Sequence, residues 1–120
     1  MNKKTLVLGA SENPSRYSNM AVFSLRKHKH DVVAIGRKPG RIDDVEIITG
    51  MPRLENIDTV TMYLNQTNQQ PYYDYIIGLK PKRIIFNPGA ENDVLEKIAH
   101  ENGIETIEAC TLVLLSIGNY

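Results

Sequence analysis

The sequence predicts an α/β protein built on an open parallel sheet of about five strands, with helices on both faces. Two observations support this prediction. Short apolar runs without clean alternation recur along the chain, which is typical of strands buried on both faces of a parallel sheet. Amphipathic helical patterns separate these runs, and such alternation implies parallel strands joined by helical crossovers.

The expected strands are short and rich in strand-forming residues. In chain order they are Thr5–Leu8, Val32–Ile35, Thr59–Leu64, Arg83–Phe86 and, more weakly, Glu105–Ala109. The segment Gly36–Ile57 breaks the rhythm and holds one possible additional short strand, Val45–Ile48.

The first two helices are expected between these strands. Ser18 can cap a helix whose apolar positions are Ala21, Val22 and Leu25. Pro71 suits the first position of a second helix. Its apolar face would consist of Tyr72, Tyr75, Ile76 and Leu79.

Two further helices complete the pattern. The segment Glu91–Asn102 has acidic residues in its first turn, and Gly103 is placed to end it. Its apolar positions are Val94, Leu95, Ile98 and Ala99. Thr111–Ile117 is apolar enough for a strand or a helix, and we favour a helix.

Composition limits the class of protein. The 120 residues suit one domain, residues 1–120, with no internal linker or repeat. The formal net charge is zero, so no bulk field attracts nucleic acid or anionic lipid. A single cysteine, Cys110, excludes an intramolecular disulfide and a cysteine-rich zinc site. The apolar stretch Leu6–Ala10 is too short for a signal peptide and no run reaches membrane-spanning length, so we expect a cytoplasmic protein.

The loop after the first strand carries anion-binding chemistry. In open parallel sheets, ligands bind beyond the carboxyl ends of the strands. Gly9 removes a side chain where the backbone would approach a ligand, while Ser11 and Asn13 offer short polar groups. Pro14 stiffens the turn, and Arg16 places a cation beside the N-terminus of the first helix. A plain turn with a solvated arginine explains the same residues equally well.

The loop after the second strand indicates which anion is expected. A dinucleotide fold for NAD has an acidic residue there, whereas this strand is followed by Gly36, Arg37 and Lys38. Two cations suit a phosphate, such as that of NADP or the ribose 3′-phosphate of coenzyme A. The first loop lacks the second and third glycines of GxGxxG, which argues against NADP bound in the dinucleotide manner. A solvated basic loop remains the alternative.

These motifs resemble the CoA-binding domain family, the single-domain group similar to the N-terminal domain of the succinyl-CoA synthetase α subunit. The family pattern G-A-S-x-x-P-x-R/K, followed by S or Y, matches Gly9, Ala10, Ser11, Pro14, Arg16, Tyr17 and Ser18. The later segment Asn87-Pro88-Gly89 resembles the family's N-P-G turn, and Cys110 resembles a cysteine that often ends its last strand.

The resemblance implies a Rossmann-like domain that binds coenzyme A. It places the pyrophosphate in the Gly9–Ser18 loop, which includes Asn13, and the phosphates near the adenosine at Arg37 and Lys38. It places the adenine or pantetheine path at Tyr63, Leu64 and Asn65, and the thiol end near Asn87, Pro88 and Gly89. The family often has N-P after the second strand, and Gly36-Arg37 departs from that pattern.

The expected function is a CoA-binding module without catalysis of its own, which senses or carries CoA or an acyl-CoA or acts with a partner. The synthetase has a second domain with a phosphorylated histidine, and these 120 residues include no such domain. We therefore expect no acyl-CoA synthesis by this chain alone. We find no Ser-His-Asp order, P-loop or zinc-ligand spacing. Cys110 is either a small buried hydrophobe or a thiol able to form a mixed disulfide with CoA.

Two other functions stay open at this point. One is an NADP-dependent oxidoreductase, which would need a GxGxxG loop and a catalytic acid or base. The other is an α/β subunit whose binding edge meets another protein. The acyl group, the pathway and the oligomeric state are not encoded in any motif, although a homodimer is conceivable.

Overall fold

The sheet is centred on β1 (Thr5–Ala10), which pairs in parallel with β2 (Val32–Gly36) on one side and β5 (Thr59–Met62) on the other. The computed structural model describes residues 2–120. The chain continues outward from β5 through β6 (Arg83–Phe86) to β7 (Glu105–Glu108), each parallel to its neighbour. The five expected strands are therefore confirmed, although the first and second end later than expected and the third and fifth end earlier.

The irregular segment adds two more strands. The possible strand Val45–Ile48 is confirmed as β4, which pairs in parallel with β2. A three-residue strand that the sequence did not indicate, β3 (Gly40–Ile42), pairs antiparallel with β4. The sheet thus has seven strands in the order β3-β4-β2-β1-β5-β6-β7, two more than expected.

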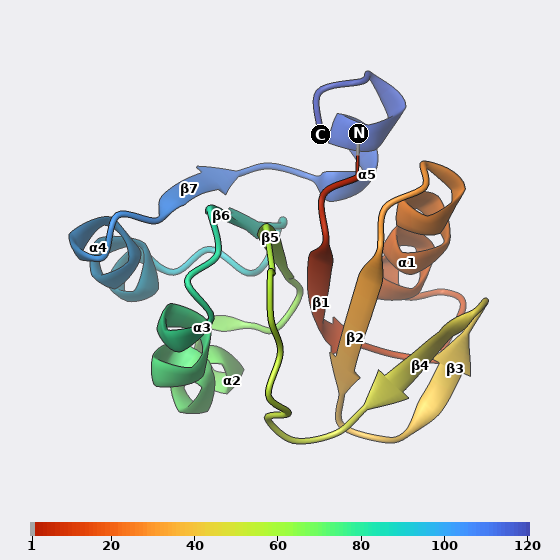
Figure 1. The fold of residues 1–120 in the computed structure, drawn as a ribbon, viewed down its shortest axis with the longest axis horizontal. Helices are drawn as coiled ribbons and strands as arrows, with labels where there is room; N and C mark the ends of the chain where they lie inside the picture. The colour runs from red at the N-terminus through yellow and green to blue at the C-terminus, as the bar shows by residue number, and fades with distance from the viewer. Residues whose placement is uncertain (1) are drawn as a thin grey trace.

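Helices cover both faces of the sheet, as expected (Figure 1). One face carries α1 (Tyr17–Lys27) and α5 (Thr111–Ser116). The other carries the remaining helical elements, which are α2 (Gln66–Gln69), the 3-10 turn η1 (Gln70–Tyr72), α3 (Tyr73–Leu79) and α4 (Asp93–Glu101).

The helix starts differ from those expected. Ser18 does not cap α1: the helix begins at Tyr17, and Ser18 is a buried residue of its first turn. Pro71 does not begin the second helix, because Asn65 caps α2 earlier and Pro71 lies in η1. Val94 is 52% exposed rather than buried, whereas Leu95 and Ala99 reach the core.

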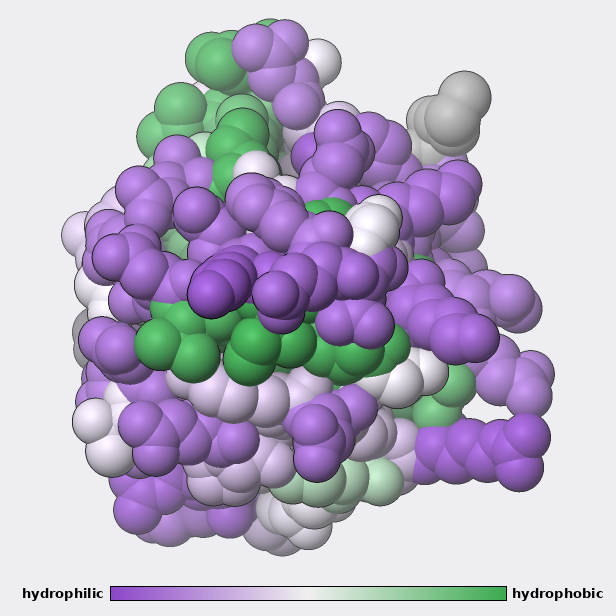
Figure 2. Space-filling model, turned by 90° about the vertical axis from the view of Figure 1, so that its left-hand side faces the viewer, coloured by the Kyte–Doolittle hydropathy of each residue, from purple (hydrophilic) through white to green (hydrophobic). Residues whose placement is uncertain are grey.

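Two apolar clusters lie on opposite faces because side chains alternate along each strand. Leu6 and Leu8 of β1 belong to the cluster beneath α3 and α4, while Val7 belongs to the cluster beneath α1 and α5. Figure 2 views the side of the molecule where α4 and β7 lie and shows a band of hydrophobic residues crossing a hydrophilic surface. Within residues 2–120, no helix has the length and apolarity needed to cross a membrane.

The amino edge of the sheet is closed by side chains from distant parts of the chain. Lys3 Nζ donates to the backbone oxygen of Tyr120 at 2.7 Å, and Thr5 Oγ1 is hydrogen-bonded to the Tyr120 hydroxyl. The Arg83 guanidinium lies 4.4 Å from the centroid of the Tyr120 ring. His30 packs against the same ring at a centroid distance of 4.9 Å.

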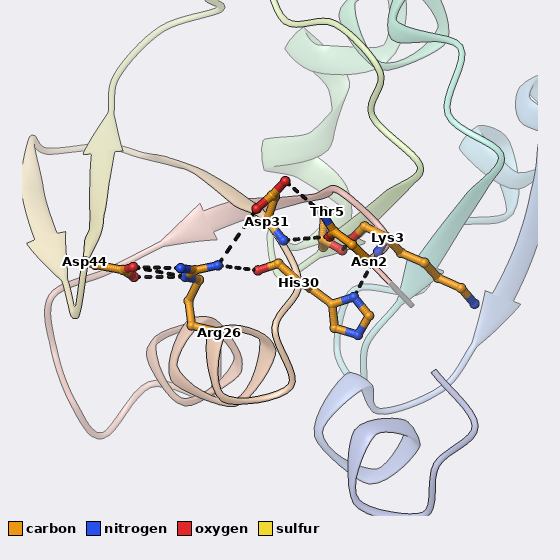
Figure 3. Close-up of polar contacts among 7 residues, drawn as sticks. All are labelled: Asn2, Lys3, Thr5, Arg26, His30, Asp31 and Asp44. Carbon is orange, nitrogen blue, oxygen red and sulfur yellow. Dashed lines mark hydrogen bonds and ion pairs between the residues drawn. The ribbon is translucent and has the colours of Figure 1, made fainter.

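Arg26 ties the end of α1 to its surroundings (Figure 3). Its Nε and Nη2 both donate to the Asp44 carboxylate, at 2.9 and 2.8 Å, and its Nη1 donates to the His30 backbone oxygen at 2.9 Å. The paired hydrogen bonds raise the pKa of Arg26 and lower that of Asp44. The β3–β4 turn is thereby fixed beside α1.

Candidate functional site

The topology brings the predicted binding loops to one edge of the sheet. The order in which successive strands are added to the sheet reverses at β1, with β2 and β4 on one side and β5, β6 and β7 on the other. The switch point lies between β1 and β5, and a crevice beyond such a point is the usual ligand position in this type of sheet. The loops after β1, β2, β5, β6 and β7 all follow carboxyl strand ends, so they share this edge.

The first loop, which follows the end of β1 at Ala10 and leads into α1, is organised by its own polar groups. Asn13 Oδ1 accepts hydrogen bonds from Ser15 N at 3.0 Å and Ser15 Oγ at 2.8 Å, and Asn13 N donates to Ser11 Oγ at 3.1 Å. Asn19 Nδ2 of α1 donates to the Ser11 backbone oxygen at 2.9 Å, which fastens the loop to the helix. Ser11 and Asn13 therefore shape this loop, whether or not they also touch a ligand.

The backbone conformation and the close neighbours of Gly9 explain why a glycine is needed at this position. Its φ is +101°, and a Cβ at this position would lie 3.2 Å from both Leu64 N and Tyr63 C. The glycine is therefore needed for the close approach of the first loop to the β5–α2 connection. Its predicted contact with a ligand stays a prediction.

The start of α1 lacks a side-chain cap. Arg16 occupies the N-cap position with extended backbone, and its side chain makes no capping hydrogen bond. By contrast, the Asn92 carboxamide caps α4 by accepting from Val94 N and Leu95 N, both at 3.1 Å. The first amide groups of α1 are thus free of a side-chain acceptor, and Pro14, Arg16 and Tyr17 around them are exposed.

The end of β2 has a required glycine, and the loop after it has free cations. A Cβ on Gly36 would lie 2.4 Å from the Ala10 backbone oxygen and 2.9 Å from Ile47 Cγ2, so the strand end tolerates no side chain. Arg37 and Lys38 follow directly and are exposed. Within residues 2–120, neither side chain forms a hydrogen bond or ion pair.

The β5–α2 connection places its three predicted residues in different surroundings. Leu64 packs on the cluster beneath α3 and α4, whereas the Tyr63 ring packs on the opposite cluster. The Tyr63 hydroxyl is buried without a hydrogen-bond partner among the described residues, and this burial raises its pKa. Asn65 caps α2 by accepting from Asn68 N at 2.9 Å. Only Asn65 is exposed.

The third part of the predicted site holds a buried hydrogen-bond network. Asn87 Nδ2 donates to Thr61 Oγ1 at 2.7 Å and to the Met62 backbone oxygen at 2.9 Å. Its Oδ1 accepts from Thr111 N at 2.9 Å. Both polar atoms of the Asn87 side chain are thus hydrogen-bonded within the protein. The exposed Pro88 and Gly89 are the residues at this turn that can reach a ligand.

Cys110 lies where β7 meets α5, at the N-cap position of that helix. Its thiol is free and half-buried. This placement leaves both interpretations of the residue open. No three metal-ligating side chains converge within residues 2–120.

Glu12 is a residue of this edge that the sequence analysis did not single out. Its Oε2 accepts a hydrogen bond from Arg41 N at 2.9 Å, linking the first loop to β3. The sequence did not indicate this contact because it did not indicate β3, whose pairing with β4 brings residue 41 near residue 12.

Comparison with known proteins identifies the family. The family model described as "CoA binding domain" matches residues 3–116, so the chain belongs to the CoA-binding domain family. The search of curated proteins found no match.

Solved structures share this fold. An uncharacterized protein known from its crystal structure is 49% identical, with a TM-score of 0.97 over 100% of this chain and 99% of that chain. A Thermus thermophilus protein, cell-free ID.343, is 20% identical, with a TM-score of 0.85 over 99% of this chain and 91% of that one. A dinucleotide-forming acetyl-coenzyme A synthetase 1 from Ca. Korarchaeum cryptofilum, in complex with phosphate and ADP, is 17% identical. Its TM-score is 0.71, over 89% of this chain and 25% of the synthetase chain.

Proposed function

We propose that this protein binds coenzyme A at the carboxyl edge of its sheet and acts as a binding module without catalysis of its own. Membership of the CoA-binding domain family supports the ligand class. The observation that carries the proposal is the unpaired positive character of this edge. The uncapped start of α1, Arg16, Arg37 and Lys38 belong to two loops beyond adjacent strands, β1 and β2.

The ADP half of CoA suits this chemistry. The amide groups at a helix N-terminus bind anions through hydrogen bonds and the helix dipole. We assign the pyrophosphate to the segment Gly9–Ser18, which runs from the end of β1 into the first turn of α1, with Arg16 as its cation. We assign the ribose phosphate to Arg37 and Lys38. An exposed cation that pairs with a phosphate contributes about 1 kcal/mol, and more when the pair is partly desolvated.

The pantetheine half of CoA carries no charge, so its path needs few charged side chains, and the loops after β5 and β6 have few of them. We assign its path to the β5–α2 connection around Leu64 and Asn65, with Pro88 and Gly89 toward the thiol end. Asn87 and Tyr63 then act as positioning residues, because the Asn87 side chain is fully hydrogen-bonded and the Tyr63 hydroxyl is buried.

Calorimetric titration tests the proposal with CoA, NADP and NAD as parallel ligands. We expect CoA to bind most tightly and Arg16→Ala to weaken its binding about tenfold. Lys97→Ala, which removes an exposed cation on α4, is the matched control and should bind as the wild type does. A preference for NADP, or no CoA binding, would contradict the proposal.

A further inference from the structure

The Glu12 side chain bridges two loops that the proposed function assigns to different parts of the ligand. Glu12 belongs to the loop after β1, and its carboxylate accepts a hydrogen bond from the backbone amide of Arg41 in β3. The side chain is exposed, so neither packing nor burial forces it into this position.

The bridge depends on Gly40. A Cβ at residue 40 would lie 2.3 Å from Glu12 Cδ and 2.7 Å from Oε1. The carboxylate therefore rests directly over the backbone at the start of β3. The colliding atoms belong to the end of a flexible side chain, so a methyl group at residue 40 would move Glu12 aside without a large rearrangement.

The carboxylate is an anion held in a cationic segment. Arg37 and Lys38 lie between β2 and β3, Arg41 lies within β3, and all three are exposed. A backbone amide beside cationic side chains is also what binds a phosphate group. The Glu12 carboxylate and a phosphate monoester are thus chemically alternative occupants of this position.

We propose that Glu12 occupies, in the free protein, the anion position that the ribose 3′-phosphate of coenzyme A takes on binding. This inference rests on the proposed function and adds a residue that sets affinity for the phosphorylated ligand. The carboxylate must leave the Arg41 amide before the phosphate can bind there. Its negative charge opposes a second anion while it stays nearby.

Two substitutions act on this contact in different ways. Glu12→Gln keeps an oxygen that accepts from Arg41 N but removes the charge. Gly40→Ala keeps the charge but places a methyl group where the carboxyl group now lies. An effect shared by both variants therefore comes from the carboxylate at this position and not from a change in one loop alone.

The experiment measures the dissociation constants of CoA and 3′-dephospho-CoA for the wild type, both single variants and the double variant. We expect each single variant to bind CoA about fivefold more tightly, the size of one exposed charge interaction. Affinity for 3′-dephospho-CoA should not change. The double variant should gain no more than the better single variant, because both changes act on the same carboxylate, one by removing its charge and the other by moving it away. The gain should shrink as salt concentration rises.

Glu101→Gln, which neutralises an exposed carboxylate at the end of α4, is the control and should leave both affinities unchanged. Unchanged or weaker CoA binding by the two variants would overturn the inference while leaving the proposed function intact. An equal change for both ligands would also overturn it, because the effect would not involve the 3′-phosphate. Failure of the wild type to bind either ligand would instead overturn the proposed function, and this inference with it.

Discussion

At the amino edge of the sheet three basic side chains surround one tyrosine, whereas at the carboxyl edge three basic side chains extend into solvent. Lys3, His30 and Arg83 all contact Tyr120, through a hydrogen bond, ring packing and a cation–π contact. Arg83 Nε also donates to Thr59 Oγ1 at 2.8 Å. The basic side chains of this edge thus contact other groups of the protein, although Arg83 Nη2 is buried without a hydrogen-bond partner among the described residues.

The basic side chains at the carboxyl edge have no such partners. Arg16, Arg37 and Lys38 are exposed, and their side chains have no hydrogen-bonding or ion-pair partner within residues 2–120. The difference teaches that basic side chains alone do not identify a site, because both edges hold them. A site is indicated instead by basic side chains that are exposed and have no partner inside the protein. Substitutions at the amino edge should therefore lower stability, and those at the carboxyl edge should lower ligand affinity.

The largest effect is expected for Tyr120→Ala, which removes the centre of the amino-edge cluster. It deletes a largely buried ring, a hydrogen bond and the cation–π contact, so the free energy of unfolding should fall by about 3 kcal/mol. Urea unfolding measures this. Tyr17→Ala at the carboxyl edge is the matched control, since this tyrosine is 69% exposed, and its effect should stay within about 0.5 kcal/mol. Equal losses of unfolding free energy in the two variants would contradict the proposed difference between the two edges.

The next effect concerns Gly36, a carboxyl-edge residue that we expect to matter for stability. Gly36→Ala forces a Cβ to within 2.4 Å of the Ala10 backbone oxygen, so we expect a loss of about 2 kcal/mol in thermal or urea unfolding. Gly78→Ala in α3 is the control, because nothing lies within 4 Å of its added Cβ. That variant should be more stable by about 0.5–1 kcal/mol. A tolerated Gly36→Ala would show that the strand ends are less tightly packed than described.

A third prediction separates affinity from stability. The double substitution Arg37→Ala/Lys38→Ala should raise the dissociation constant of CoA about tenfold, because two unpaired cations are lost. Its unfolding free energy should match the wild type within about 0.5 kcal/mol. A variant that loses stability but binds CoA normally would reverse the roles of these residues.

The smallest effect is a pH dependence at the amino edge. Burial, followed by the surrounding positive charges, lowers the pKa of His30 below its usual 6.5. The neutral ring accepts from Lys3 N at 2.9 Å through Nδ1, so protonation breaks this bond. The stabilisation is present above the unfolded-state pKa and is lost as pH falls through about 6.5 toward the folded-state value.

Urea unfolding at pH 7.5 and pH 5 should therefore show a steeper loss for the wild type than for His30→Gln. His28→Gln, on the exposed histidine at the end of α1, should behave as the wild type does. A wild type and a His30→Gln variant with the same pH dependence would refute the assignment.

The fold was predictable from the sequence to the extent that local pattern determines it. The apolar runs around Leu6, Val60 and Ile84 became buried strands, because such runs have few alternatives in a chain of this composition. β3 was missed because it has only three residues and forms by pairing with β4, which is not a local property. The cap expected at Ser18 failed because α1 begins at Tyr17, so this short polar side chain is buried within the first turn.

The candidate site was predictable as a set of loops rather than as a set of contacts. Parallel topology brought Gly9, Gly36 and Asn87 to one edge, as expected. The sequence could not show that the Asn87 side chain belongs to a buried hydrogen-bond network, or that the Glu12 side chain reaches the Arg41 amide. Both facts depend on side chains from segments that meet only in the folded chain.

The central claim is that the carboxyl edge binds CoA, and amide chemical-shift mapping during a CoA titration tests it most directly. The account predicts the largest shifts at the amides of Gly9–Ser18 and Gly36–Lys38, excluding Pro14, with little change at His30 and Arg83. Shifts concentrated at His30, Arg83 and Tyr120, or no shifts at saturating CoA, would contradict it.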